Sequence, residues 1–319
     1  MKVLFVSSGN SDYWEIVPFI KSQGESLKRK GVDLKYYPIK GKGLSGYIRN
    51  ISRLRKYIIE FNPDIVHTHY SISGWVSLFA NPKKPRILSL MGSDTYGSVG
   101  KRGKGNIRSI LMRIQVNFIQ YFFKTIIVKS ENLRKFVWLK ENVYTIPNGV
   151  NYSIFRPIEK TTARKELALP LNKKLILFIG NPKDPRKNLA LVNKALQLLK
   201  EENVELITPY PVKHFEVSKY LNACDVLVFT SFKEGSPNVI KEALACNTRI
   251  VTTPSGDILD RVKGVESVWI SKFDEKDFAK KLKLALCDKG LVNSSNQVRN
   301  EIDEDKIANS IIDIYKGLI

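Results

Sequence analysis

The stretch 229–254, FTSFKEGSPNVIKEALACNTRIVTTP, constrains the fold of this chain more than any other part of its sequence. It begins in an apolar run, 225–230, turns at 235–237, continues as a helix-like segment at 238–246 and ends in a second apolar run, 249–253. The order strand, loop, helix, strand is typical of doubly wound α/β proteins with parallel sheets. In such proteins, ligands bind where the loops leave the carboxyl ends of the strands.

The turn itself predicts where the helix begins. Ser236 is a favourable N-cap, and Pro237 suits a first helical turn because its missing N–H costs no hydrogen bond there. We therefore expect the helix to start near Ser236, with its N–H groups and positive dipole end able to hold a diphosphate. Glu234 and Glu242 frame this turn, with seven residues between them. The first could reach a sugar hydroxyl and the second a ribose; the alternative is two solvated charges beside an ordinary βα turn.

The segment EGSPNVIKEALA closely resembles the E-x7-E segment of the retaining glycosyltransferases of family 4, which have the GT-B fold. The resemblance implies that Glu242 binds the ribose of a nucleotide and that Glu234 contacts the transferred sugar. The residues whose backbone would hold the diphosphate are Gly235, Ser236, Pro237, Asn238 and Val239.

A second apolar run, LILFIG, ends at Gly180 and is typical of a parallel strand buried on both faces. The following NPKDPRKN resembles the part of the family in which an Arg and a Lys neutralise the donor diphosphate. Lys187 matches the lysine, with one extra residue in the loop, and lysine suits a phosphate as a point charge. Asn181 holds the arginine position, so Arg186 or Lys183 is the candidate substitute. Solvated loop lysines are the alternative.

Two further positions are assigned to the donor. Tyr210 follows the strand-like run that begins at Val204, at the place where relatives seat the base, and could stack on it. Gly9 follows the first apolar run, 2–7, in a turn of small residues. A lone glycine does not make the G-x-G-x-x-G fingerprint, so a Rossmann dehydrogenase is not supported.

Two motifs in the first half point to the acceptor side. NPDIVHTH resembles the P-D-I-V-H-x-H segment of the family, so His67 and His69 are candidates for lining the cleft; a structural, hydrogen-bonding histidine is the alternative. MGSD resembles the family's H-G-S-D, whose His faces the donor sugar. Met91 is a departure from that pattern, and it leaves Asp94 as the candidate for catalysis. The acceptor-side candidates are His67, His69, Gly92, Ser93 and Asp94.

The first half of the chain is strongly basic. Residues 1–155 contain 25 Lys and Arg against 9 Asp and Glu, within a net charge of +21 for the whole chain. The glycine-rich loop 97–106 is either a mobile surface loop or an anion clamp for a lipid phosphate. It leads into 107–124, whose apolar residues recur at helical spacing; such a stripe is usually core, but its charges and aromatic end permit a membrane-surface helix. The cations assigned to that surface are Lys101, Arg102, Lys104, Arg108 and Arg113.

Other composition features limit location and cofactors. No apolar run approaches the roughly 18 residues that span a bilayer, and the chain opens as a strand rather than a cleavable signal. We therefore expect a cytoplasmic protein, peripheral on the inner face of the cell membrane if the basic half binds lipid. The three cysteines are predicted buried thiols. The acids of Asp303-Glu304-Asp305 are predicted capping charges, so no metal site and no cofactor are expected.

A chain of 319 residues suits two domains. VYTIPNGVN, at 143–151, resembles the I-P-N-G-V-D linker of the family. The prediction is a GT-B fold of two doubly wound, Rossmann-like domains facing a cleft: an acceptor-binding domain, 1–155, and a donor-binding domain, 156–300. The resemblance also implies a C-terminal helix, 301–319, that packs back on the first domain.

The implied activity moves a sugar from a nucleotide diphosphosugar to a glycan or lipid-linked acceptor with retention, in bacterial surface polysaccharide biosynthesis. Glu234, Lys187 and Asp94 are the catalytic candidates, and no metal is needed because Lys187 and a helix N-terminus would stabilise the leaving diphosphate. A GT-B nucleotide-sugar epimerase is one alternative, although no paired acid and base is visible. A basic nucleic-acid-binding protein is another, but no helix-turn-helix, zinc or stacking-sheet motif is present, so no nucleic-acid partner is expected.

Overall fold

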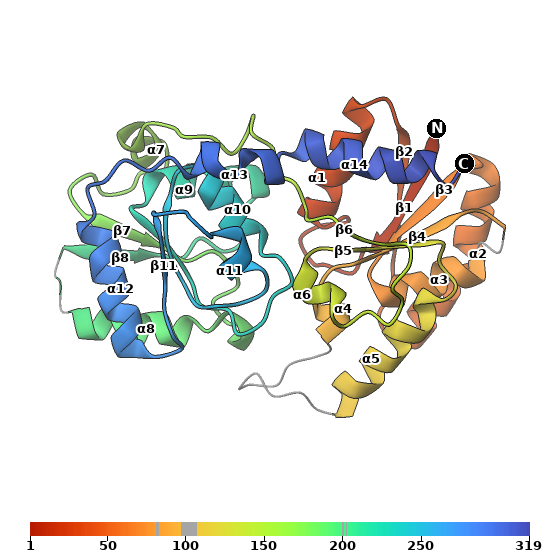
Figure 1. Cartoon of the computed structure of the whole chain (residues 1–319), viewed down its shortest axis with the longest axis horizontal. Helices are drawn as coiled ribbons and strands as arrows, with labels where there is room; N and C mark the ends of the chain where they lie inside the picture. The colour runs from red at the N-terminus through yellow and green to blue at the C-terminus, as the bar shows by residue number, and fades with distance from the viewer. Residues whose placement is uncertain (81–82, 97–106, 200, 202) are drawn as a thin grey trace. The chain divides into compact units, whose positions relative to one another are not determined.

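The computed structural model divides the chain into two compact α/β units (Figure 1). The first unit contains the chain up to Gly149 together with Glu304–Ile319, and the second is Val150–Asp303. The predicted domain limits at 155 and 300 lie close to these boundaries. The structure describes residues 1–80, 83–96, 107–199, 201 and 203–319, with the side chains of 93, 96 and 107–109 excepted.

The first unit contains a parallel sheet in the order β2-β1-β3-β4-β5-β6. Its inner strands are largely buried, because helices cover both faces of the sheet, and β1 and β5 are mostly apolar whereas β3 carries His67, Thr68 and His69. The strands are β1 Lys2–Ser8, β2 Asp33–Ile39, β3 Ile65–His69, β4 Arg86–Leu90, β5 Thr125–Val128 and β6 Val143–Thr145. The helices are α1 Pro18–Arg29, α2 Gly43–Phe61, α3 Ser71–Ala80, α4 Ser93–Tyr96, α5 Ile107–Gln120, α6 Glu131–Arg134 and α14 Glu304–Lys316.

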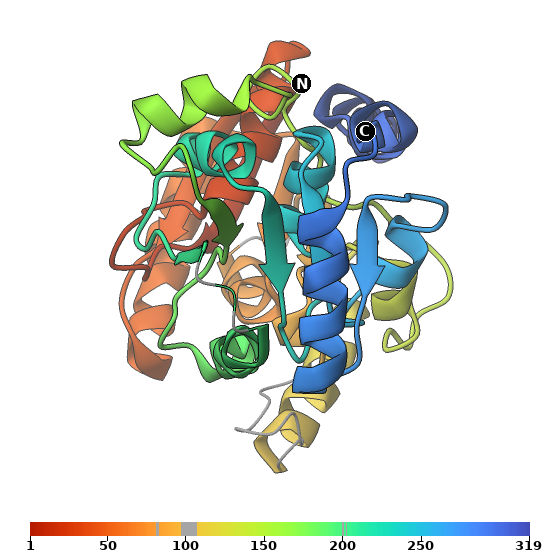
Figure 2. The ribbon, with the colours of Figure 1, turned by 90° about the vertical axis from the view of Figure 1, so that its left-hand side faces the viewer.

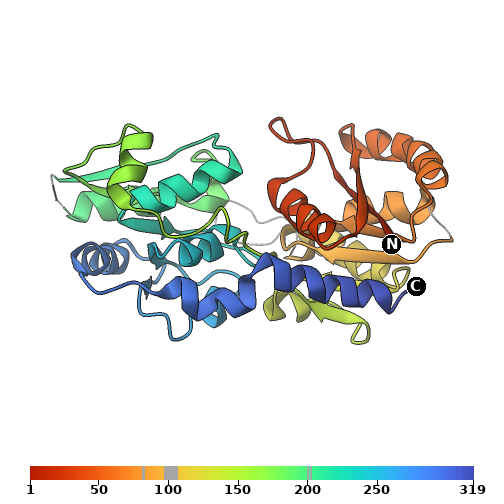
Figure 3. The ribbon, with the colours of Figure 1, turned by 90° about the horizontal axis from the view of Figure 1, so that it is seen from above.

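The last helix of the chain, α14, belongs to the first unit. It lies beside α1 (Figures 1 and 3). Its residues Ile311 and Tyr315 are fully buried in the same apolar cluster as Phe5 of β1. At its start, Glu304 pairs with Arg29 of α1. The predicted capping acids therefore begin α14, and the described residues hold no cluster of three metal-ligating side chains.

The second unit has a parallel sheet in the order β11-β10-β9-β7-β8 (Figure 2, in which α12 is the blue helix facing the viewer). Helices α8 and α12 pack together on one face, and α9, α10 and α13 cover the other. The strands are β7 Lys174–Leu177, β8 Val204–Ile207, β9 Val226–Phe229, β10 Arg249–Thr252 and β11 Val268–Ile270. The helices are α7 Lys160–Glu166, α8 Leu189–Leu199, α9 His214–Ala223, α10 Asn238–Ala245, α11 Ile258–Arg261, α12 Glu275–Cys287 and α13 Ser294–Ile302.

The strand order of the second sheet reverses between β7 and β9. β8 pairs with one edge of β7, and β9 pairs with its other edge. The connections that leave the adjacent strands β7 and β9 therefore run in opposite directions along the sheet. Such a switch point opens a crevice at the carboxyl ends of the strands, which is where open α/β sheets bind ligands. The topology therefore places a candidate site at the loops after β7 and β9.

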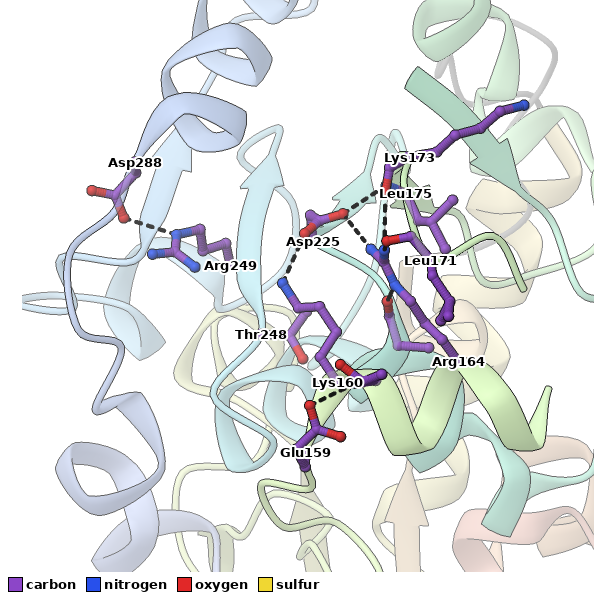
Figure 4. A network of polar contacts seen from close by, with 12 residues as sticks. Glu159, Lys160, Arg164, Leu171, Lys173, Leu175, Asp225, Thr248, Arg249 and Asp288 are labelled. Atoms are coloured by element: carbon purple, nitrogen blue, oxygen red, sulfur yellow. Dashed lines mark hydrogen bonds and ion pairs between the residues drawn. The ribbon is translucent and has the colours of Figure 1, made fainter. Parts of the chain in front are cut away.

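A partly buried polar network fixes the amino ends of the same two strands (Figure 4). The carboxylate of Asp225, just before β9, accepts from the backbone N–H of Leu175 in β7 at 2.7 Å. Arg164 of α7 donates to Asp225 at 2.8 Å, and Lys160 contacts its other oxygen at 2.7 Å. Because Arg164 is only 5% exposed, the pairing of β7 with β9 is held by a desolvated contact, well away from the loops at their carboxyl ends.

No helix in the described part of the chain is both long enough and apolar enough to cross a membrane.

Candidate functional site

Helix α10 begins at the carboxyl end of β9, one residue later than the sequence predicts. Pro237 is its N-cap, and no side chain caps the helix. The prediction that Ser236 caps it is wrong, because the Ser236 hydroxyl donates instead to Asp257 at 2.8 Å. The positive end of the α10 dipole therefore faces the loop 230–237, and the hydroxyl oxygen of Ser236 does not cap it.

Lys187 and Glu234 form an ion pair between the loops that follow β7 and β9. Their Nζ and Oε1 atoms are 2.6 Å apart, and about a quarter of each side chain is exposed. The Thr230 hydroxyl donates to the backbone carbonyl of Lys187 at 2.8 Å, so the two loops are also joined through the main chain. Lys187 further lies over the ring of Phe229, 5.6 Å from its centroid. The structure therefore brings together two of the predicted site residues at the switch point.

Gly180 explains how the Lys187 side chain passes the end of β7. Its φ is +141°, a conformation that favours glycine. A Cβ at this position would lie 3.5 Å from the Lys187 chain, in ordinary contact. Gly180 therefore shapes the turn beneath Lys187 through its backbone conformation.

Arg186, predicted as a substitute for the family arginine, is paired within its own turn. Asp184 caps the 3₁₀ turn Pro185–Lys187 and also accepts two side-chain hydrogen bonds from the Arg186 guanidinium. This bond to Asp184 raises the pKa of Arg186. Lys183 is exposed in the same turn. Lys187 is thus the cation that the structure directs at the loop after β9.

A second turn supports the loop from below. At Gly256 φ is +64°, and a Cβ there would lie 2.6 Å from the carbonyl oxygen of Gly235. Asp257 accepts from Ser236 and also from Arg261, at 3.2 Å. The close approach of these two backbones requires glycine and fixes the position of the loop in front of α10.

A buried lysine lies under this loop. Lys241 of α10 is 1% exposed, and its ammonium contacts the Ser236 hydroxyl at 3.2 Å. Burial lowers the pKa of Lys241 to about 8, while nearby Asp257 opposes that effect. Local sequence does not predict the burial of Lys241, because a lysine within a helix is usually a solvated side chain.

Glu242 is held by a residue that sequence reasoning missed. It is almost fully buried in α10, and its Oε1 lies 2.8 Å from Nε2 of His214, the first residue of α9. The His214 ring packs against Phe155 with centroids 5.2 Å apart. His214 appeared isolated in the sequence, since only the packing of α9 on α10 brings it to Glu242.

Tyr210 follows β8 and is 37% exposed. It is accessible for the predicted stacking on a base, which stays a prediction.

The histidines predicted for the acceptor side are fully buried in the first unit. His67 bonds the hydroxyls of Tyr315 at 2.6 Å and Ser89 at 2.7 Å. His69 stacks on His67 with centroids 4.6 Å apart, and among the described residues neither of its ring nitrogens has a hydrogen-bond partner. Burial lowers the pKa of both rings well below the usual value. For His67 the contacts favour the structural alternative, in which it ties α14 to the sheet.

The other first-unit candidates lie at the carboxyl edge of its sheet, Gly9 and Gly92 in the turns after β1 and β4, and Ser93 and Asp94 at the start of α4. The Asp94 carboxylate accepts from the backbone N–H groups of Ser71, Met91 and Gly92, and burial raises its pKa. Its oxygens thus join two loops. A Cβ at Gly9 would lie 2.6 Å from Pro38, so Gly9 permits the close approach of β1 and β2. The side chain of Ser93 lies outside the described part of the chain, as do Arg108 and the loop cations Lys101, Arg102 and Lys104.

The fold is shared with solved structures. Sucrose-phosphate synthase from Thermosynechococcus elongatus superposes with a TM-score of 0.83 at 16% identity, covering 99% of this chain and 98% of that one. HepE from Anabaena, in complex with UDP-glucose, gives a TM-score of 0.76 at 14% identity over 100% of both chains. UDP-GlcNAc 2-epimerase from Methanocaldococcus jannaschii gives 0.61 at 11% identity, covering 99% and 100%. The chain therefore has the GT-B fold.

Family profiles give the more particular assignment. Residues 14–153 match the profile described as Glycosyltransferase Family 4, and residues 209–288 match the one described as Glycosyl transferases group 1. Together these matches span more than half of the chain and reach into both units. The chain belongs to the GT-B glycosyltransferases of this group.

Two curated relatives are about one quarter identical in sequence to this chain. A Bacillus subtilis glycosyltransferase assigned to teichuronic acid biosynthesis, TuaC, is 25% identical over 61% of this chain and 54% of its own. This chain thus spans about half the length of that relative. N,N'-diacetylbacillosaminyl-diphospho-undecaprenol alpha-1,3-N-acetylgalactosaminyltransferase from Campylobacter jejuni is 23% identical over 92% of this chain and 88% of its own.

Proposed function

We propose that this chain transfers a sugar from a nucleotide diphosphosugar to a glycan or lipid-linked acceptor, with retention of configuration. The observation that carries the proposal is the ion pair between Lys187 and Glu234 beside the start of α10, at the switch point of the second sheet. A cation and a helix N-terminus together suit a diphosphate, and a neighbouring carboxylate suits sugar hydroxyls.

In the proposed reaction the bond between the anomeric carbon and the diphosphate breaks, and a bond to the acceptor oxygen forms on the same face. The acceptor proton passes to the departing diphosphate. Lys187 would move from Glu234 to the phosphate as the donor binds, which frees the Glu234 carboxylate for the sugar. Glu242, held by His214, would accept hydrogen bonds from the ribose. Charge stabilisation of the leaving group is then the main contribution of the protein.

We propose that no metal is required, because Lys187 and the dipole of α10 can stabilise the leaving diphosphate as a divalent cation would. Turnover should be unchanged by EDTA. A complete loss that Mg²⁺ or Mn²⁺ restores would contradict this mechanism and return Asp303 and Asp305 to consideration as ligands.

We further propose that the acceptor belongs to the assembly of a bacterial surface polysaccharide, at the inner face of the cell membrane. The names of the two curated relatives support this class, since one concerns teichuronic acid and the other an acceptor linked to undecaprenol diphosphate. The basic first half suits anionic lipid phosphates.

Two rival functions are separable by one experiment. The protein is incubated with a panel of nucleotide sugars, beginning with UDP-sugars, and release of the nucleoside diphosphate is measured with and without lipid extracts or oligosaccharides. Release that rises with acceptor, together with labelled sugar in the acceptor, is the expected result. Inversion at a sugar carbon, with no sugar transferred to any acceptor, would indicate an epimerase. Binding of nucleic acid with no release from any donor would exclude a transferase.

A further inference from the structure

Four aromatic rings form a continuous ladder on the surface of the first unit. Trp75 of α3 stacks on Phe79, with centroids 6.0 Å apart, and on Phe118 of α5, at 6.1 Å. Phe118 in turn meets Phe122 edge-on at 5.5 Å. The Trp75 indole N–H donates to Gln115, so the ring that joins the two helices is also fixed in orientation. Helices α3 and α5 lie side by side (Figure 1), and the contact of Trp75 with Phe118 joins them.

The apolar stripe of α5 faces solvent and not the core. Leu111 is 61% exposed and Phe118 is 53% exposed, whereas Val116 and Ile119 supply the buried side of the helix. The usual core interpretation of this stripe is therefore wrong for Ile110, Leu111, Ile114 and Phe118, all of which are exposed. Together with the ladder, the exposed stripe defines what we call the aromatic face, formed by Ile72, Trp75, Phe79, Ile110, Leu111, Ile114, Phe118, Tyr121 and Phe122.

The sequence around the aromatic face is basic and almost free of acids. Residues 65–130 contain ten Lys and Arg but one acid, Asp94, and that carboxylate is buried under three backbone N–H groups. Two arginines hold the edges of the face, since Arg55 donates to the carbonyl of Phe79 at 2.7 Å and Arg86 donates to that of Phe122 at 3.0 Å. Of the ten cations, Arg113 lies on α5 and Lys124 follows the helix, and both are exposed. Exposed apolar rings and positive charge therefore occur together in this segment, and its one acid is buried.

We propose that the aromatic face docks the protein on an anionic lipid bilayer. Aromatic side chains favour the interfacial layer of a bilayer, and apolar side chains flanked by Lys and Arg bind anionic leaflets by partial insertion and charge attraction. A monomer in water rarely exposes so many large apolar side chains together, which indicates a covered surface. The excess of Lys and Arg over acids in residues 65–130 favours an anionic bilayer over a neutral one. The biological meaning rests on the proposed function, because docking would bring the protein to a lipid-linked acceptor.

The test is co-sedimentation with vesicles of phosphatidylcholine alone or mixed with phosphatidylglycerol, at low and high salt. Wild type should pellet with the anionic vesicles and much less with the neutral ones. The triple variant Leu111→Gln, Ile114→Gln, Phe118→Gln should bind anionic vesicles at least tenfold more weakly. A matched control, Leu171→Gln, Leu198→Gln, Leu284→Gln, replaces residues of similar exposure in the second unit and should bind as wild type does.

A charge variant gives an independent measurement that leaves the apolar side chains intact. Arg113→Gln with Lys124→Gln should lower binding to anionic vesicles by about tenfold or more at low salt. Its control, Lys280→Gln with Lys283→Gln, removes two exposed cations from α12 and should have little effect.

The proposal would be overturned if wild type stayed in the supernatant with all vesicles, or if both the triple variant and the charge variant pelleted as their controls do. It would also be overturned if light scattering showed a dimer that the triple variant disrupts and its control does not. Slow release of nucleoside diphosphate from the donor into water needs no lipid. Vesicle binding without any donor turnover would therefore contradict the proposed function alone, and turnover without vesicle binding would contradict only this inference.

Discussion

The Nε2 atom of His214 lies 2.8 Å from Oε1 of Glu242, although the two residues are 28 positions apart in the chain. His214 begins α9 and Glu242 lies within α10, so the contact depends on how these helices pack on the sheet. Glu242 is nearly buried and His214 is about one third exposed. His214 is therefore a positioning residue that fixes the carboxylate assigned to the ribose.

Replacing His214 should affect donor binding more than the chemical step. In His214→Ala the Glu242 carboxylate loses its partner, so we expect the KM for the donor to rise about tenfold with a smaller change in kcat. His214→Gln, whose amide N–H can donate, should recover part of the loss. Lys219→Ala on the same helix breaks only the exposed pair with Glu166 and serves as the control. A kcat that falls at constant KM would argue against a positioning role.

Removing the charges of the switch-point site should impair turnover without unfolding the protein. We expect Lys187→Ala and Glu242→Ala each to lower kcat/KM by about 100-fold or more, because each would remove a contact to the donor. Lys173→Ala, which breaks the exposed pair with Glu205, is the matched control and should behave as wild type. Thermal melts verify folding. Turnover at the wild-type rate in either site variant would contradict the proposed donor site.

Two glycines with the same backbone handedness allow a steric test of the loop. Gly256 and Gly264 both have positive φ, +64° and +78°, so an alanine carries similar backbone strain at either position. Only at Gly256 would the new Cβ meet another backbone, the carbonyl of Gly235 at 2.6 Å; nothing lies within 4 Å at Gly264. We expect Gly264→Ala to cost about 1 kcal/mol of stability with normal kinetics. Gly256→Ala should also lower kcat/KM at least tenfold. Equal kinetics for the two variants would contradict the inference that the turn at Gly256 positions the loop in front of α10.

Sequence patterns predicted those parts of the fold and site that depend on neighbouring residues. The strand and loop at Gly180, the lysine at 187 and the E-x7-E spacing around α10 are local, so they could be placed before the structure was known. The contact of His214 with Glu242 could not, because nothing local marks a pair formed by helix packing. Ser236 was misassigned for a similar reason, since its hydroxyl bonds Asp257 from a later loop. The exposure of Phe118 also depends on which side of α5 meets the sheet, which its periodicity does not fix.

The buried Lys241 should give stability a distinct pH dependence. Burial lowers its pKa from 10.5 to about 8 in the folded state, so between those values the unfolded chain binds more protons at this position. The free energy of unfolding contributed by Lys241 therefore rises with pH across this window, and its full cost applies below about pH 8. Lys241→Met should remove that rise, which we expect to be on the order of 1–3 kcal/mol.

Urea denaturation of wild type and Lys241→Met at several pH values provides the measurement. The buried thiols of Cys224 and Cys246, whose pKa values burial raises to about 12, act in the opposite direction but are present in both proteins. The difference between the two curves therefore isolates Lys241. A difference that does not vary between about pH 8 and about pH 10 would contradict the assignment.

The bond between His67 and Tyr315 should contribute to the stability of the first unit. Tyr315→Phe removes a fully buried hydroxyl and leaves Nδ1 of His67 without its partner, so we expect a loss of about 1–3 kcal/mol. Tyr144→Phe alters a tyrosine that is 43% exposed in β6 and should be neutral. Tryptophan fluorescence during urea denaturation reports the change. Equal midpoints for the two variants would mean that the hydroxyl of Tyr315 is dispensable.

The return of α14 to the first unit has a consequence for synthesis. Ile311 and Tyr315 complete an apolar cluster whose other members include Ile65 and Phe5, which leave the ribosome about 250 and about 310 residues before Tyr315. The second unit is a continuous segment and can form its core as soon as it emerges, whereas the first must wait for residues 304–319. Contacts so distant in sequence slow folding and keep apolar surface open to chaperones and proteases. During translation, the half of the protein that is made first is therefore the half that folds last.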